Sequence, residues 1–162
     1  MMERETLLAW TVLLGVLLVA GCGASAVQMH ARASIATSAA GRAFGVAVDR
    51  GRAISLDRVT RESEPFDRET RANALRAEAR RWDPLGSGLD TFRTALRAWV
   101  DAIELAHLAG EDEETLSLVG RLAARVVLLY DGLSRIAQGL DLEAPELPVF
   151  VRDLAVSLAG GE

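Results

Sequence analysis

Apolar residues recur every three or four positions along two stretches in the later half of the chain. This is the spacing of a helix with one buried face. The first stretch runs from residue 84 to residue 110, with apolar positions at Leu85, Leu89, Phe92, Leu96, Trp99, Ile103 and Ala106. The second runs from residue 111 to residue 139, with Val119, Leu122, Val126, Leu129, Leu133, Ile136 and, just beyond, Leu140. Each stretch predicts a long helix that packs in a bundle.

Residues with strong preferences for helix ends stand at the borders of both stretches. Asp83 and Pro84 predict the start of the first helix, as an N-cap carboxylate and a first-turn proline, and Gly110 predicts its end. The four acidic residues 111–114 suit the positive end of the second helix dipole, and Gly139 ends that helix.

The earlier half carries a weaker helical pattern that is rich in Ala, Ser and Gly. From about residue 24 to residue 60, small residues share one helical face, at Ala31, Ser34, Ser38, Gly41 and Gly45. This face predicts one long helix that approaches its neighbour closely. We expect a break at residues 64–65, a shorter helix over residues 67–82, and a final short helix after the turn at residues 145–148.

These segments together predict an all-α fold, an antiparallel bundle of about four helices with a short C-terminal capping helix. The sequence shows neither the alternating pattern of strands nor an internal repeat. Residues 22–162 are enough to bury one core and are expected to form the helical bundle domain. The segment before them, residues 1–21, has a different character.

This first segment has the features of an export signal. Residues 7–20 form an uncharged, leucine-rich run that is shorter than the ~20 residues of a membrane-spanning helix. The run ends in Val19-Ala20-Gly21-Cys22, an aliphatic residue and two small residues before a cysteine. This tetrad resembles the lipobox of bacterial lipoproteins.

The resemblance implies that residues 1–21 are a signal peptide that is removed, and that Cys22 carries a thioether-linked diacylglycerol. It also implies acylation of the new N-terminus, for example by palmitate, and two or three acyl chains suffice for stable anchoring. Gly23 stands where the family's inner-membrane retention signal has Asp, which implies the outer membrane, with the protein facing the periplasm.

Two other interpretations of the same segment stay open. Residues 7–27 are long enough to form an uncleaved membrane anchor. Alternatively, Cys22 is an ordinary buried thiol at the end of a core helix.

Composition and charge exclude several classes of protein. Half of the residues are hydrophobic, which excludes a disordered chain, and a single cysteine excludes an internal disulfide. The net charge of -5 argues against binding to nucleic acid. Arg exceeds the acidic residues over residues 22–100, and the acids exceed Arg over residues 101–162. Either the two halves complement each other when the helices pack, or the positive half faces anionic lipid headgroups.

A search for chemical motifs indicates neither a catalytic nor a metal site. Glu104 and His107 have the Glu-x-x-His spacing of di-iron bundles, but His30 lacks the matching Glu, so a surface or helix-end histidine is expected instead of a metal site. Asp131 comes closest to a carboxylate in an apolar stretch, and Arg135 four residues later offers it a helical ion pair. We therefore expect no enzymatic activity, cofactor or metal.

The sequence as a whole predicts a lipid-anchored, non-catalytic protein of the bacterial cell envelope. It would be an adaptor or structural component, bound to the membrane through the lipid on Cys22 and to a possible envelope protein partner. One alternative is a phage-type inhibitor, exclusion or lysis accessory lipoprotein. Another is a helical carrier whose seam over residues 119–140 lines a cavity for a hydrophobic ligand.

Overall fold

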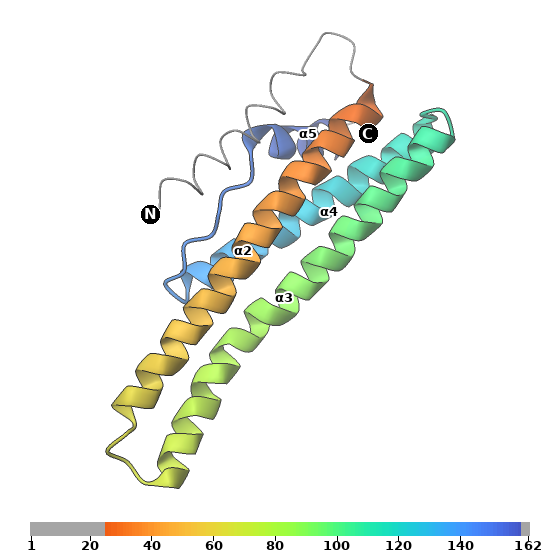
Figure 1. The fold of residues 1–162 in the computed structure, drawn as a ribbon. Helices are drawn as coiled ribbons and strands as arrows, with labels where there is room; N and C mark the ends of the chain where they lie inside the picture. The colour runs from red at the N-terminus through yellow and green to blue at the C-terminus, as the bar shows by residue number, and fades with distance from the viewer. Residues whose placement is uncertain (1–24, 160–162) are drawn as a thin grey trace.

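The computed structural model describes residues 25–159, which form an antiparallel arrangement of helices without a strand in that range (Figure 1). Three helices are long, namely α2 (Ala26–Glu62), α3 (Arg68–Leu108) and α4 (Glu113–Gln138), and α5 (Val149–Ala159) is short. The expected all-α bundle with a short C-terminal helix is confirmed. Within the described range it is built from three long helices rather than four.

Each long helix begins at a residue whose side chain accepts a hydrogen bond from the first turn. These N-caps are Ser25, Asp67 and Asp112, which bind backbone N–H groups two or three positions later. The chain reverses between α3 and α4 through Gly110 and Glu111, with φ angles of 77° and 61°. Only Gly adopts this left-handed conformation without a steric cost, which accounts for the glycine after α3.

The helix boundary expected at Asp83 and Pro84 is wrong, because α3 runs through both residues. Pro84 has no N–H to donate to the carbonyl of Arg80, and its side chain is exposed. Trp82 and Leu85 on either side of it are buried, at 5% and 0% exposure. Burial of these two large side chains offsets the missing hydrogen bond, and the two helices expected here are one.

The centre of the core is a cluster of three aromatic rings, one from each long helix. Tyr130 of α4 lies with its ring centroid 5.6 Å from that of Phe44 on α2 and 5.5 Å from that of Phe92 on α3. All three side chains are at most 1% exposed. Tilted and edge-on contacts at these distances are favourable for aromatic pairs.

The buried face of α4 includes three residues of the expected seam, and it also includes Gly120, Ala123, Tyr130 and Ala137, which lay outside that seam. Val119, Val126 and Leu133 are buried as expected. Ile136 is 39% exposed, and Tyr130 takes a core position that the leucine pattern did not include.

The small residues of α2 allow the close approach that the sequence predicts. A Cβ atom at Gly41 would lie only 2.5 Å from Cε1 of Phe92, so the backbone of α2 packs directly against this ring. Two apolar residues of the same helix, Ile35 and Ile54, point to solvent instead, at 56% and 60% exposure.

Helices α2 and α3 extend beyond the end of α4 and form a two-helix projection, which we call the arm and define as residues 52–81 (Figure 1). Leu133 of α4 packs against Gly88 of α3, and α4 ends soon afterwards. The base of the arm is closed where Gly51 meets Trp82 and Leu142. Beyond that point α2 and α3 have only each other as long partners.

The opposite end of the bundle holds the first turns of α2 and the turn between α3 and α4 (Figure 1). His30 of α2 contacts Trp99 of α3, which places the start of α2 level with the last turns of α3. The acidic residues 111–114 therefore lie at the same end as the start of the described chain. The antiparallel course does not divide the bundle into a positive end near the N-terminus and a negative end away from it.

Candidate functional site

The lipobox residues Val19, Ala20, Gly21 and Cys22 lie outside the described residues. The first described residue is Ser25, the N-cap of α2, three positions after Cys22. A group attached to Cys22 is thus separated from this helix by a very short stretch of chain.

The most unusual polar group in the described region is His30, at the end of the bundle nearest to that attachment point. Its side chain is fully buried, and its ring lies edge-on to the ring of Trp99, with 5.8 Å between the centroids. Neither nitrogen of His30 nor Nε1 of Trp99 has a hydrogen-bond partner among residues 25–159. Buried polar atoms without partners are rare and costly in folded proteins.

Burial is what sets the protonation state of His30. Removal of the imidazole from water lowers its pKa from 6.5 to about 4, since the charged form loses its hydration. Desolvation is the cause of this shift, with no contribution from a neighbouring charge in the described helices. His30 is therefore neutral at pH 7.

The two histidines differ in their exposure to solvent. His107 is exposed, as a surface histidine should be, while His30 belongs to the buried face of α2. The signal was present in the spacing, because Val27, His30, Ser34 and Thr37 step by three and four and are all buried.

A second polar cluster, which no pattern in the sequence indicated, lies inside the arm. The carboxylate of Glu78 is 8% exposed and accepts hydrogen bonds from the Ser55 hydroxyl, from Nε1 of Trp82 at 3.3 Å and from Arg81 at 3.2 Å. The hydrogen bond from Ser55, helped by those from Trp82 and Arg81, lowers the pKa of Glu78. The cluster joins α2 to α3 and keeps a buried charge fully paired.

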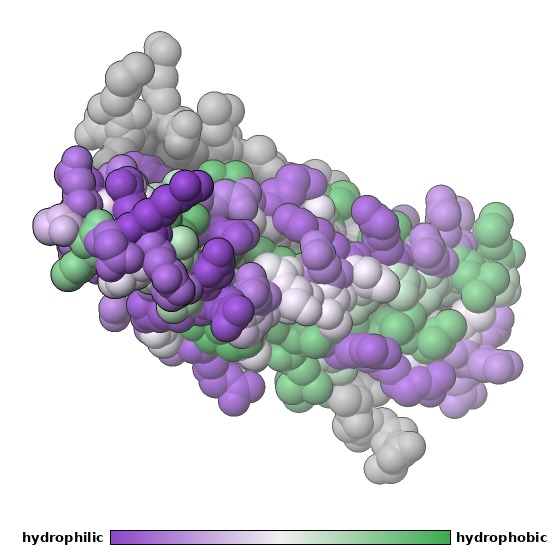
Figure 2. All heavy atoms as spheres, turned by 90° about the horizontal axis from the view of Figure 1, so that it is seen from below, coloured by the Kyte–Doolittle hydropathy of each residue, from purple (hydrophilic) through white to green (hydrophobic). Residues whose placement is uncertain are grey.

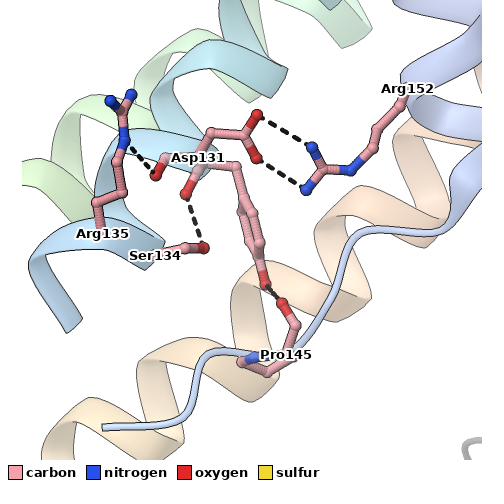
Figure 3. Close-up of polar contacts among 6 residues, drawn as sticks. Asp131, Ser134, Arg135, Pro145 and Arg152 are labelled. Atoms are coloured by element: carbon pink, nitrogen blue, oxygen red, sulfur yellow. Dashed lines mark hydrogen bonds and ion pairs between the residues drawn. The ribbon is translucent and has the colours of Figure 1, made fainter. Parts of the chain in front are cut away.

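A third set of polar contacts fastens α5 and the preceding loop to α4 (Figure 3). Arg152 of α5 forms two bonds to the carboxylate of Asp131, at 2.8 and 3.0 Å. The hydroxyl of Tyr130 donates a hydrogen bond to the carbonyl of Pro145 at 2.6 Å. Burial raises the pKa of Tyr130 to about 12, so this hydroxyl stays protonated. We call these contacts the α4–α5 clasp.

The ion pair between Asp131 and Arg135 that the sequence predicted is wrong. Arg135 does not pair with the carboxylate of Asp131; its Nε atom donates instead to the backbone carbonyl of Asp131, at 3.3 Å (Figure 3). The carboxylate points to Arg152, because a partner on another helix can approach both of its oxygens side-on.

Replacement of Arg152 by alanine should lower the free energy of unfolding by about 1 kcal/mol, since the pair is partly open to water. Urea unfolding would measure this loss, and amide hydrogen exchange in α5 should speed up. Arg135→Ala is the matched control and should change both readouts less. An equal effect of the two replacements would contradict the assignment of Arg152 as the partner of Asp131.

Two of the larger hollows of the described surface have polar or mixed linings. One, of about 670 Å³, lies beside the clasp and is lined by Ser134, Gln138, Glu143, Ala144, Pro145, Glu146 and Arg152. The other, of about 560 Å³, runs between α3 and α4 and includes Asp90 and Arg125. Both lie outside the aromatic cluster of the core.

Within residues 25–159, no three His, Cys, Asp or Glu side chains gather closely enough to hold a metal ion. The helices of the same range include none with a stretch long and apolar enough to cross a bilayer. Comparisons with family models, with curated proteins and with solved structures found no match to the chain.

Proposed function

We propose that this chain is a lipid-anchored, non-catalytic protein of the bacterial envelope, an adaptor that extends its arm from the membrane towards a protein partner in the periplasm. The observation that carries the proposal is the course of α2. This helix begins four residues after Cys22 and continues unbroken for 37 residues into the arm. At 1.5 Å per residue it is about 55 Å long, so it separates an anchored end from a free end.

The free end offers features that suit contact with a protein. Phe66, in the turn at the tip of the arm, is 59% exposed, and Ile54 on the side of the arm is 60% exposed. Exposed aromatic and aliphatic side chains surrounded by charged ones are typical of protein-binding surfaces.

The core supports an adaptor more than a carrier of a hydrophobic ligand. The seam of α4 that would line a ligand cavity is packed against Phe44 and Phe92 through Tyr130. A carrier needs an apolar pocket, and charged residues border both hollows described above.

Replacement of Cys22 by serine tests the anchor. The unaltered chain should be recovered with membranes, with the mass of a protein that lacks residues 1–21 and carries acyl chains, whereas the Cys22→Ser variant should lose the lipid. Membrane fractionation and mass spectrometry of both proteins are the measurements. Unmodified full-length chain in the membranes of both would indicate an uncleaved anchor instead.

A second variant tests the proposed location separately from the anchor. Gly23→Asp places the acidic residue of the inner-membrane retention signal directly after the lipidated cysteine. If the lipoprotein resemblance is correct, this variant should keep its lipid and move from the outer to the inner membrane. Unchanged distribution between the two membranes would contradict the sorting prediction and leave lipidation intact.

The role of the arm can be tested with a photo-crosslinking amino acid at single positions in the anchored protein. At position 66 it should give a discrete crosslinked product with an envelope protein. Leu128, which is 69% exposed on α4, is the matched control away from the arm and should give no such product. The same product from both positions, or none from position 66, would contradict an adaptor that acts through its arm.

A further inference from the structure

The end of the bundle opposite the arm exposes apolar side chains that the core does not use. Leu108, the last residue of α3, is 82% exposed, and Leu105 one turn earlier is 49% exposed. Met29, in the first turn of α2, is 44% exposed. We call these three residues the apolar end.

The distribution of hydrophobic surface supports this description. Figure 2, seen from below, shows hydrophobic residues among hydrophilic ones on the right of the view, at the end of the bundle that carries the turn between α3 and α4. The side nearest the tip of the arm is mostly hydrophilic in the same view. Exposure of large leucine side chains to water is unfavourable, and their contact with an apolar phase lowers the free energy.

The chain that precedes the described residues indicates where such a phase lies. Only Gly23 and Ala24 separate Cys22 from the N-cap Ser25, and three residues of chain span at most about 10 Å. A lipid on Cys22 therefore places the bilayer within that distance of the start of α2. An uncleaved anchor over residues 7–27 would place it at the same end.

We propose that the apolar end of the bundle contacts the lipid bilayer, with Leu105 and Leu108 reaching the boundary between headgroups and acyl chains. The inference rests on the proposed function, because it takes the membrane to lie at the N-terminal end of α2. The lipid on Cys22 then supplies attachment, and the leucines orient the bundle so that the arm points away from the membrane.

The neighbouring charges limit how deeply this end enters the bilayer. The acidic residues 111–114 lie in this turn and at the start of α4, and burial of carboxylates in hydrocarbon is costly. The contact is therefore shallow, and it favours zwitterionic over anionic headgroups, since like charges repel. Vesicles of phosphatidylethanolamine and phosphatidylcholine are accordingly the appropriate surface for a test.

The single cysteine makes the experiment direct. In lipidated protein the thiol of Cys22 is blocked, so Leu108→Cys introduces the one free thiol of the chain, to which an environment-sensitive fluorophore can be attached. In vesicles its emission should shift to shorter wavelength and be quenched by a quencher carried on the lipid. Phe66→Cys at the tip of the arm and Leu128→Cys on α4 are controls and should show emission typical of water.

The outcomes separate this inference from the proposed function. Emission typical of water at position 108, in protein that stays bound to the vesicles, overturns the lipid contact and leaves the anchor standing. Loss of the protein from the vesicles overturns both. The same label can be placed at position 108 of the unlipidated Cys22→Ser protein, which has no other thiol because serine replaces Cys22. A shifted emission of this protein without vesicles would mean that protein covers this face, and it would also overturn the lipid contact.

Discussion

Acidification from pH 7 to pH 4 should lower the free energy of unfolding by about 3 kcal/mol through His30 alone. In the folded state burial holds the pKa of His30 at about 4, whereas the unfolded chain has a histidine of pKa 6.5. Below pH 6.5 the unfolded state binds a proton that the folded state does not bind, so stability falls as the pH falls. The loss accumulates between pH 6.5 and pH 4 and levels off below the folded pKa.

Urea unfolding at a series of pH values would measure this slope. His30→Leu should remove it, because leucine fills similar space without a titratable group. His107→Leu is the matched control at an exposed position and should keep the slope. A slope that persists in His30→Leu would show that another group is responsible.

The titration of carboxylates contributes little to the change in stability in the upper part of this pH range. The pKa of Glu78 is lowered in the fold by its hydrogen bonds, so its contribution is present above the unfolded pKa and is lost as the pH falls further. For a glutamate in an unfolded chain that pKa is about 4.3. Stability lost between pH 6.5 and pH 5 therefore reports on His30.

Replacement of Gly41 by valine should lower the free energy of unfolding by about 2 kcal/mol or more. The first added carbon would lie 2.5 Å from Cε1 of Phe92, well inside the contact distance. Phe92 is 1% exposed and is held by the ring of Tyr130, so it has little room to withdraw. Chemical denaturation is the measurement.

Two further variants separate overpacking from other effects of glycine replacement. Gly132→Ala in α4 meets no atom within 4 Å and should raise stability by up to about 1 kcal/mol, as alanine does in helices. Phe92→Leu shortens the opposing side chain and should recover part of the loss when combined with Gly41→Val. Additive effects of the two replacements would contradict a direct contact between these positions.

The periodicity of apolar residues within one helix predicted much of the fold, but the contacts between helices could not be predicted from it. The spacing of apolar residues predicted α4 and part of its buried face, namely Val119, Val126 and Leu133, because that spacing depends on helix geometry alone. The local signals at Asp83 and Pro84 predicted a boundary that the structure does not have. Burial of Trp82 depends on Gly51 and Leu142, which are remote in sequence, and no local pattern could weigh that burial against the proline.

The partners of the polar groups were also not predictable where they lie on different helices. The sequence predicted an ion pair between Asp131 and Arg135 because residues four apart lie on the same face of one helix. The ion-pair partner of Asp131 in the structure is Arg152, which belongs to another helix. Ser55 and Glu78 are likewise on different helices. The lipobox at Val19–Cys22 is a local motif that sequence can identify, and it stays a prediction because it lies outside the described residues.

The buried carboxylate of Glu78 has a mechanical consequence for the arm. A slide of α2 along α3 by one turn would carry the Ser55 hydroxyl away from Glu78, and the buried carboxylate would keep as partners only Arg81 and Trp82 of its own helix. The arm is therefore fixed in register although it lacks a third helix. We therefore expect a force applied at its tip to be transmitted along α2 to the opposite end of the bundle, because slippage would break the hydrogen bond from Ser55 to Glu78.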